Sequence, residues 1–143
     1  MKLALDEAKK AAKMGEVPVG AIITDSCGKI IARAHNLRET ANDATAHAEI
    51  IAIREANKKL KSWRLTDLTM YVTLEPCPMC AGAILNSRIS RLVYGATDIK
   101  AGAVESLFAI LSHKKLSADT EIRAGVLEDE CKALLQKFFK DRR

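Results

Sequence analysis

The alternation of helix-like and strand-like segments is the feature that most constrains the fold of this chain. Apolar residues at helical spacing over 3–14 give way to an almost wholly apolar stretch over 17–24, and the two patterns then alternate along most of the sequence. Amphipathic helices interleaved with buried strands can cover both faces of one sheet. The order therefore predicts an α/β protein of three layers (α/β/α) with a five-stranded mixed sheet.

The expected elements follow from apolar periodicity and from the residues that start and stop helices and turns. Gly15 ends the first helix, and residues 25–28 form a turn between the first two strands. The last helix has acidic residues at its start and basic residues at its end, which suits the helix dipole. The predicted helices are 3–14, 46–60, 78–86, 104–111 and 128–140, and the predicted strands are 17–24, 29–34, 68–74, 89–94 and 121–124.

Length and composition indicate one globular unit. We expect a single domain over residues 1–143, because no repeat, low-complexity tract or linker divides the chain. The composition, 48% apolar and 29% charged, excludes wholesale disorder. The 23 Lys and Arg residues outnumber the 18 Asp and Glu residues, and the net charge of +5 permits a polyanionic partner such as RNA without requiring one.

Membrane and secretory segments are not expected in this sequence. The longest apolar run, around residues 17–23, is about a third of a transmembrane span. We therefore expect a cytoplasmic protein with no membrane partner. In that reducing compartment the four cysteines are expected to be thiols or metal ligands rather than disulfides.

Two short segments carry the residues most suited to chemistry. The first contains His47 and Glu49, and the second is Glu75-Pro76-Cys77-Pro78-Met79-Cys80. Alone, the first is typical of a surface pair and the second of a redox pair, half of a structural zinc site or two buried thiols. Together they predict a catalytic zinc site, because His47, Cys77 and Cys80 supply three ligands and leave a fourth position open. Helix N-termini also favour thiolates.

Glu49 is expected to act beside the metal rather than on it. It lies two residues after His47, about 200° around a regular helix, so the two side chains share a centre only if the metal sits beyond the helix start. There Glu49 would contact the metal-bound water and carry protons, as general base and then general acid. The alternative is a solvated carboxylate that pairs with the helix dipole.

The combination His-x-Glu followed by Pro-Cys-x-x-Cys resembles the signature of zinc nucleobase deaminases. In that chemistry zinc lowers the pKa of bound water, and the resulting hydroxide attacks the ring carbon that bears the amino group, C6 in adenine. Ammonia leaves after Glu49 has passed on the proton.

Over essentially its whole length the chain resembles the bacterial tRNA-specific adenosine deaminase family, within the cytidine-deaminase-like superfamily. The resemblance is carried by residues 15–21, 35–36, 45–49, 71–77, 79–83, 87–89, 94–96, 98–103 and 138–139. The resemblance implies hydrolysis of adenosine to inosine at the anticodon wobble position of a tRNA, classically tRNA-Arg. It also implies a cytidine-deaminase-like fold, one Zn²⁺ per subunit and a homodimer, with the tRNA anticodon stem-loop as partner and no DNA.

The resemblance also implies a role for individual residues. His47, Cys77 and Cys80 would bind zinc, Glu49 would carry protons, and the remaining matches would bind substrate. Asn36 would hydrogen-bond the flipped adenine, the Ala48 backbone would lie against the base, Asp98 and Lys100 would meet the RNA backbone, and Phe139 and Arg143 would meet the anticodon loop.

Several of these residues have simpler explanations in local structure. Asn36 and Asp98 are typical turn residues. Phe139 lies off the centre of its helix's apolar stripe, which leaves it free either to stack on a base or to pack at the rim of a subunit contact. The basic residues Lys58, Lys59, Lys61 and Arg64 predict a solvated helix end rather than an RNA track.

Two other functions use the same residues and remain open from sequence. One is a deaminase of a free nucleobase such as guanine or cytosine, with a closed pocket in place of an RNA surface. The other is a non-catalytic, zinc-stabilised tRNA-binding subunit that pairs with an active partner. Loss of the proton-carrying carboxylate would be expected in the second case, and Glu49 is present.

Overall fold

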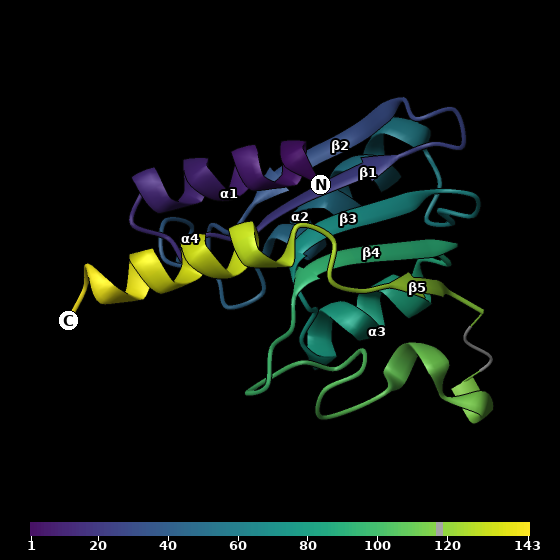
Figure 1. Cartoon of the computed structure of the whole chain (residues 1–143). Coiled ribbons are helices and arrows are strands. Elements are labelled where there is room, and N and C mark those ends of the chain that lie inside the picture. The colour runs from purple at the N-terminus through teal and green to yellow at the C-terminus, as the bar shows by residue number, and fades with distance from the viewer. Residues whose placement is uncertain (117–118) are drawn as a thin grey trace.

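The computed structural model describes residues 1–116 and 119–143, and its centre is one five-stranded mixed sheet (Figure 1). The strand order across the sheet is β2-β1-β3-β4-β5. β1 is antiparallel to both of its neighbours, whereas β3, β4 and β5 run parallel to one another. The strands are β1 (Gly20–Thr24), β2 (Ile30–His35), β3 (Thr69–Leu74), β4 (Arg91–Ala96) and β5 (Glu121–Arg123).

Four α-helices cover the two faces of the sheet and make the predicted three layers. In Figure 1, α1 and α4 lie on the face toward the viewer, and α2 and α3 lie behind the sheet. The central strand β3 has a neighbouring strand on each side, and three of its six residues are buried. The helices are α1 (Lys2–Lys13), α2 (Ala48–Leu60), α3 (Pro78–Asn86) and α4 (Glu128–Lys140).

Most predicted elements are confirmed, with some of their ends shifted. The strand predicted over 17–24 begins only at Gly20, and the helix predicted from residue 46 begins at Ala48 with His47 as its N-cap. The other predicted strands agree to within two residues, and helix 128–140 agrees at both ends. The apolar periodicity of 128–140 predicts that Cys131, Leu134, Leu135 and Phe138 face inward; in α4 Cys131 and Phe138 are buried, and Leu134 and Leu135 are partly buried.

The helix predicted over 104–111 is wrong. Residues 104–106 form turns, and the first regular element is a short 3₁₀ helix, η1 (Ile110–Ser112), followed by η2 (Lys114–Leu116). The backbone N–H groups of Val104, Glu105 and Ser106 donate to the Glu75 carboxylate. Donors held by a side chain from another part of the chain are not available to build a helical turn.

A very close approach holds α1 against the sheet at Gly20. A Cβ atom at this position would lie 2.5 Å from the backbone nitrogen of Ala8 and 2.8 Å from the Cβ of Glu7, and nearer still to the carbonyl oxygen of Ala4. The face of α1 that meets the sheet is correspondingly lined with small residues, and Ala4, Ala8 and Ala11 are fully buried. The absence of a side chain at Gly20 therefore sets the distance between the first helix and the sheet.

The carboxyl ends of three strands, β2, β3 and β4, lie together at one end of the sheet. β3 and β4 are parallel and in register from Thr69–Arg91 to Leu74–Ala96, so their carboxyl ends lie together. β2 ends at the same edge, because His35 pairs with Gly20 at the start of β1 and β1 is antiparallel to β3. Ligands of α/β sheets commonly bind at such carboxyl ends.

Within the described ranges 1–116 and 119–143, no helix has both the length and the apolar character that crossing a lipid bilayer requires.

Candidate active site

Three side chains with metal-binding atoms meet where α2 and α3 begin. His47 is the N-cap of α2, Cys77 is the N-cap of α3, and Cys80 lies one turn into α3. The His47 Nδ1 atom is 3.7 Å from the Cys77 Sγ atom and 3.6 Å from the Cys80 Sγ atom. The three ligand atoms all lie within 4.8 Å of one another, so the two sequence motifs form one candidate metal site.

The spacing of these atoms fits a tetrahedral zinc ion. A Zn–N bond of about 2.0–2.1 Å and a Zn–S bond of about 2.3 Å at the tetrahedral angle separate nitrogen from sulfur by roughly 3.6 Å. The observed separations of 3.7 and 3.6 Å match that value without any change of backbone. Two thiols and one imidazole are also the donors that select zinc over magnesium or calcium.

Hydrogen bonds prepare one thiol as a metal ligand. A hydrogen bond from the Cys80 thiol, joined by one from His47 and opposed by burial, lowers the pKa of Cys77 to about 4. Cys77 is therefore a thiolate at neutral pH, which is the form that binds a metal. The same contact raises the pKa of Cys80, and the hydrogen bond to Cys77 raises the pKa of His47. Metal binding would release the protons held by this cluster.

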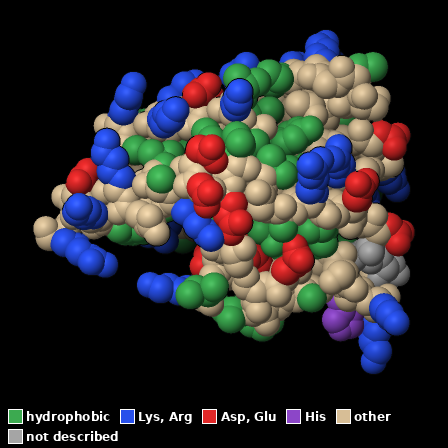
Figure 2. Space-filling view, in the orientation of Figure 1, with side chains coloured by type: hydrophobic (Ala, Val, Ile, Leu, Met, Phe, Trp, Pro, Cys, Tyr) green, Lys and Arg blue, Asp and Glu red, His purple; other side chains and the backbone are tan. Residues whose placement is uncertain are grey.

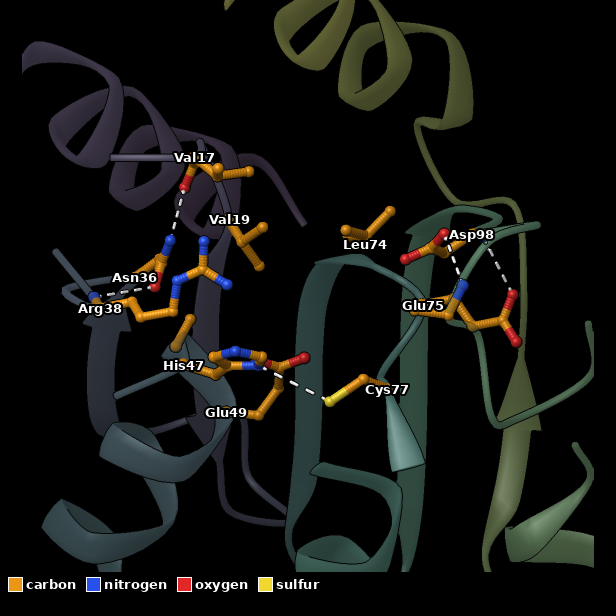
Figure 3. A pocket seen from close by; sticks show the side chains of 12 residues that line it. Val17, Val19, Asn36, Arg38, His47, Glu49, Leu74, Glu75, Cys77 and Asp98 are labelled. Atoms are coloured by element: carbon orange, nitrogen blue, oxygen red, sulfur yellow. Dashed lines mark hydrogen bonds between the residues drawn. The ribbon is translucent and has the colours of Figure 1, made fainter. Parts of the chain in front are cut away.

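Glu49 lies beside the metal ligands and is shielded from water. Its side chain comes from the first turn of α2 and points toward the same space as His47 and Cys77 (Figure 3). The residue is only 4% exposed, which excludes the solvated carboxylate considered from the sequence. Burial raises the pKa of Glu49 to about 7. A carboxyl group with that pKa can both accept and donate a proton at neutral pH.

A cavity of about 160 Å³ opens directly in front of these groups. A cavity of roughly this size admits a ring such as benzene, so one planar base is a suitable occupant. The walls come from five segments of the chain, 17–19, 36–38, 47–49, 74–77 and 98–101, several of which Figure 3 shows around the cavity. They are lined by Val17, Val19, Asn36, Arg38, His47, Ala48, Glu49, Leu74, Glu75, Cys77, Asp98 and Ala101.

One wall presents Asn36, the predicted base-binding residue. Its side-chain nitrogen donates to the carbonyl of Val17 at 3.3 Å, and its side-chain oxygen accepts from the backbone of Arg38 at 3.2 Å. Asn36 therefore organises a turn and also lines the cavity, while its hydrogen bond to a base stays a prediction. Ala48 is fully buried at the start of α2 and lines the floor of the same cavity.

The opposite wall is the loop after β4, which contains Asp98 and Lys100. The Asp98 carboxylate accepts hydrogen bonds from the backbone of Lys100 at 3.0 Å and of Ala101 at 3.1 Å, as expected of a turn residue. Asp98 nevertheless lines the cavity, whereas Lys100 is exposed outside it. The loop therefore has one side toward the cavity and one toward solvent.

The end of α4 adds a basic groove next to this loop. Lys100, Phe139 and Arg143 line one surface groove, together with Lys140 and Arg142. Phe139 is 49% exposed, so its ring is available for stacking. Lys and Arg side chains are prominent at the end of the molecule where α4 terminates (Figure 2). The predicted RNA-binding residues thus fall on the cavity (Asn36, Ala48 and Asp98) or on this groove (Lys100, Phe139 and Arg143).

Sequence reasoning assigned no role to three residues around the cavity, although two of them, Glu16 and Glu75, stand in segments that it singled out. Arg38 lines it and has no local signal that distinguishes it from other loop arginines. Glu16 is buried and accepts from the backbone of Glu39 and Thr40, so it fixes the loop that follows Asn36. Glu75 is buried at the end of β3, and an acidic residue that ends an apolar strand was the available signal.

The fold and site together define a class of protein. A three-ligand metal group with one open position, a buried proton-carrying carboxylate and a cavity for a planar ring are the parts that a hydrolytic nucleobase deaminase requires. The family model of the MafB19-like deaminases matches residues 1–143. The chain belongs to that deaminase family, and within it to the tRNA-specific adenosine deaminases.

Two curated relatives and one solved structure support this placement. The tRNA-specific adenosine deaminases of Bacillus subtilis and Haemophilus influenzae are 51% and 50% identical over 143 residues, covering 100% of this chain and 88% and 83% of theirs. A solved structure from a study of A-to-I editing by tRNA:A34 deaminases at the wobble position superposes with a TM-score of 0.90 and 46% identity, covering 94% of this chain and 97% of that chain. Guanine deaminase from Bacillus subtilis is more distant, with a TM-score of 0.64 and 36% identity over 74% of this chain and 78% of that chain.

Proposed function

We propose that this protein hydrolyses adenosine to inosine at the wobble position of a tRNA anticodon, with tRNA-Arg as the expected substrate. The observation that carries the proposal is the placement of Glu49, buried beside a three-ligand metal group at the floor of a cavity sized for one base. The names of the relatives at 50–51% identity support the choice of tRNA adenosine as substrate.

Zinc is the metal that we assign to His47, Cys77 and Cys80, one ion per subunit. The donor set and the separations of 3.6 and 3.7 Å support that assignment. Zinc held there would supply the hydroxide nucleophile that hydrolysis at neutral pH requires, because it lowers the pKa of water.

Glu49 moves the protons of the reaction. Its carboxylate accepts a proton from the attacking water and delivers it to the ring nitrogen N1 next to C6, and a second transfer allows the amino group to leave as ammonia. The C6–oxygen bond forms and the C6–nitrogen bond breaks, so adenosine and water give inosine and ammonia. The pKa of about 7 places Glu49 at the optimum for work in both directions.

The remaining residues of the cavity hold the base. Asn36 is fixed by Val17 and Arg38 and presents its amide to a ring nitrogen, while the Ala48 backbone packs against the ring. A base can enter only after it leaves its stack, which costs least in a single-stranded loop such as the anticodon loop.

The groove of Lys100, Phe139 and Arg143 receives the rest of the anticodon loop. Phe139 offers a ring for a neighbouring base, and the cationic side chains offer partners for phosphates. Asp98 keeps the loop of Lys100 in shape between the groove and the cavity.

We also infer a cytoplasmic homodimer. Two large apolar side chains, Leu107 and Phe108, are 53% and 56% exposed on adjacent positions, and a second copy of the chain would cover them. Light scattering of the purified protein should give twice the mass of the 143-residue chain, and Phe108→Glu should shift it toward the monomer.

The decisive experiment is sequencing of total tRNA before and after treatment with the zinc-loaded enzyme, which reports each new inosine and its position. Glu49→Ala should form no detectable inosine while it retains one zinc per chain, whereas Cys77→Ala should lose both. Undiminished inosine formation by Glu49→Ala would refute the proton-transfer role.

The same preparation separates the two other functions. Release of ammonia from free guanine or cytosine at rates comparable to those on tRNA would favour a free-base deaminase. Unchanged tRNA after long incubation with zinc-loaded protein would favour a non-catalytic tRNA-binding subunit.

A further inference from the structure

A second buried carboxylate, Glu75, lies at the end of β3 and takes no part in the chemistry above. It is 2% exposed, and hydrogen-bond donors surround it. One oxygen, Oε2, accepts from the backbone N–H groups of Val104 at 3.1 Å, Glu105 at 2.9 Å and Ser106 at 3.0 Å. The other, Oε1, accepts from the backbone of Asp98 at 3.1 Å and from the Ser106 hydroxyl.

All five donors belong to one loop, residues 98–106, which we call the wall loop. Asp98 and Ala101 of this loop line the cavity opposite Asn36. The loop begins two residues after β4 and is bound at both of its ends by the one carboxylate (Figure 3 shows the contact with Asp98). The carboxylate therefore ties both ends of the loop to the segment that follows β3.

Glu75 is also joined directly to the metal site. It stands two residues before the ligand Cys77, and the carbonyl of the intervening Pro76 accepts from the backbone of Ala103 at 2.8 Å. The wall loop and the ligand segment are therefore held together by six hydrogen bonds, five of them to Glu75. Contacts so concentrated on one charged group are stronger than the same number of neutral bonds.

The wall loop also approaches too closely for a side chain at its centre. A Cβ atom at Gly102 would lie 2.5 Å from the carboxyl carbon of Glu75 and slightly closer to the backbone oxygen of Asp98. Gly102 thus lets the backbone wrap around the carboxylate. The contact is built from both sides, by the acid that directly follows β3 and by the glycine in the loop.

We propose that Glu75 is a positioning residue for substrate: its carboxylate sets the distance between the wall loop and the Cys77 segment, and so the width of the cavity that receives the base. The proposal rests on the proposed function for the identity of the substrate. Although Glu75 borders the cavity, both of its carboxylate oxygens accept hydrogen bonds from the wall loop, so it acts through Asp98 and Ala101.

Glu75→Gln tests this role with almost no change in volume. An amide offers one acceptor oxygen and one NH₂ group, and the NH₂ group in either orientation would face two or three N–H or O–H donors. Hydrogen–deuterium exchange should therefore speed up by at least about tenfold at the amides of Asp98, Val104, Glu105 and Ser106 and remain unchanged in α2.

Kinetics with an anticodon stem-loop RNA give the second readout. KM, and the Kd measured by fluorescence anisotropy with the same RNA, should rise by about tenfold in Glu75→Gln, while kcat changes by less than about twofold. The ligands His47, Cys77 and Cys80 are held at the starts of α2 and α3, whose helical hydrogen bonds the substitution leaves intact, so zinc content should remain one per chain. A merely structural role would lower thermal stability without this separation of KM from kcat.

Ser106→Ala supplies a milder variant, because it removes a single donor to Glu75. Its effect on KM should be smaller and should vanish in the Glu75→Gln background, since both changes break one contact. Ser87→Ala is the matched control: it removes a buried hydroxyl that donates to Ile84 on α3, away from the wall loop. It should leave KM unchanged.

Three results would overturn the proposal: unchanged exchange at the four amides, unchanged KM and Kd despite faster exchange, or a fall in kcat with loss of zinc. If the parent protein forms no inosine, the proposed function fails, but exchange and Kd still decide whether Glu75 positions an RNA-binding loop. If Glu75→Gln does not fold, Ser106→Ala and its control decide the same question.

Discussion

Substitution of Gly20 by alanine should destabilise this protein far more than one added methyl group suggests. The new Cβ atom would lie 2.5 Å from the backbone nitrogen of Ala8 and 2.8 Å from the Cβ of Glu7, where ordinary contact begins near 3.4 Å. Neither neighbour is the end of a flexible side chain. The clash can be relieved only if α1 retreats from β1 by roughly 1 Å, since packed backbones do not interpenetrate.

The cost follows from what α1 buries. Ala4, Ala8 and Ala11 are each fully buried under the helix, and a gap of 0.5–1 Å forfeits about a quarter to a half of each dispersion contact. Overpacked cores typically lose about 1–3 kcal/mol, and the upper end, about 3 kcal/mol, applies because the clashing atoms are backbone. For a chain of this size that corresponds to a fall in Tm of roughly 6–12 °C.

The same substitution at Gly82 is the matched control. Gly82 lies inside α3, and a Cβ there would meet nothing within 4 Å. Because alanine is the better helix former, Gly82→Ala should raise stability by about 0.5–1 kcal/mol. Urea titration and calorimetry of both variants, at one protein concentration and fully zinc-loaded, would measure the two changes. A Gly20→Ala protein that melts with the parent would refute the argument for a fixed distance between α1 and the sheet.

Two further predictions concern a buried ion pair and an exposed ring. Burial raises the pKa of Glu7, but hydrogen bonds from Lys10 and His35 outweigh it and lower that pKa below 4.5, its value in the unfolded chain. The ionised Glu7 carboxylate therefore stabilises the fold at pH values above 4.5. This stabilisation is lost as the pH falls through the lowered pKa of the folded state. Glu7→Gln should therefore unfold more easily than the parent at neutral pH, with a difference in urea midpoint that shrinks in acid; a constant difference at all pH values would contradict this. Phe139→Ala should raise the Kd for an anticodon stem-loop by about 5–100-fold, the range for one base stacked on an aromatic ring. The Tm should change little because Phe139 is 49% exposed. Unchanged RNA binding would show that Phe139 does not contact the RNA.

Local patterns predicted most of the fold because the decisive signals lie within short windows. Helix 128–140 is marked by charges at its two ends and an apolar stripe between them, and the structure has it over the same residues. The three metal-binding side chains were brought together correctly because each motif precedes a helix, and N-caps of two helices can meet at one point. These features need no knowledge of contacts between distant parts of the chain.

The wrongly predicted helix and two of the overlooked residues, Glu16 and Glu75, involve contacts between distant residues. Residues 104–111 have helical apolar spacing, but Glu75, 29 residues before Val104, takes the N–H groups that a helix would use. Glu16 supports the loop at Glu39 and Thr40 in the same way, 23 and 24 residues away. A segment whose backbone N–H groups bind a carboxylate needs no particular residue types, because every residue except proline offers the same N–H group. Such a contact therefore cannot be predicted from the sequence of that segment.

The metal ligands and much of the remaining cavity wall belong to different kinds of segment. His47, Cys77 and Glu49 stand at the starts of helices, whereas Asn36, Arg38, Asp98 and Ala101 belong to connecting loops and the basic groove includes the end of α4. Replacement of loop residues can therefore change the substrate preference while the metal ligands and Glu49 stay unchanged. For protein engineering, libraries confined to 36–45 and 98–106, with Gly102 retained, are the ones expected to give new specificities at undiminished zinc occupancy.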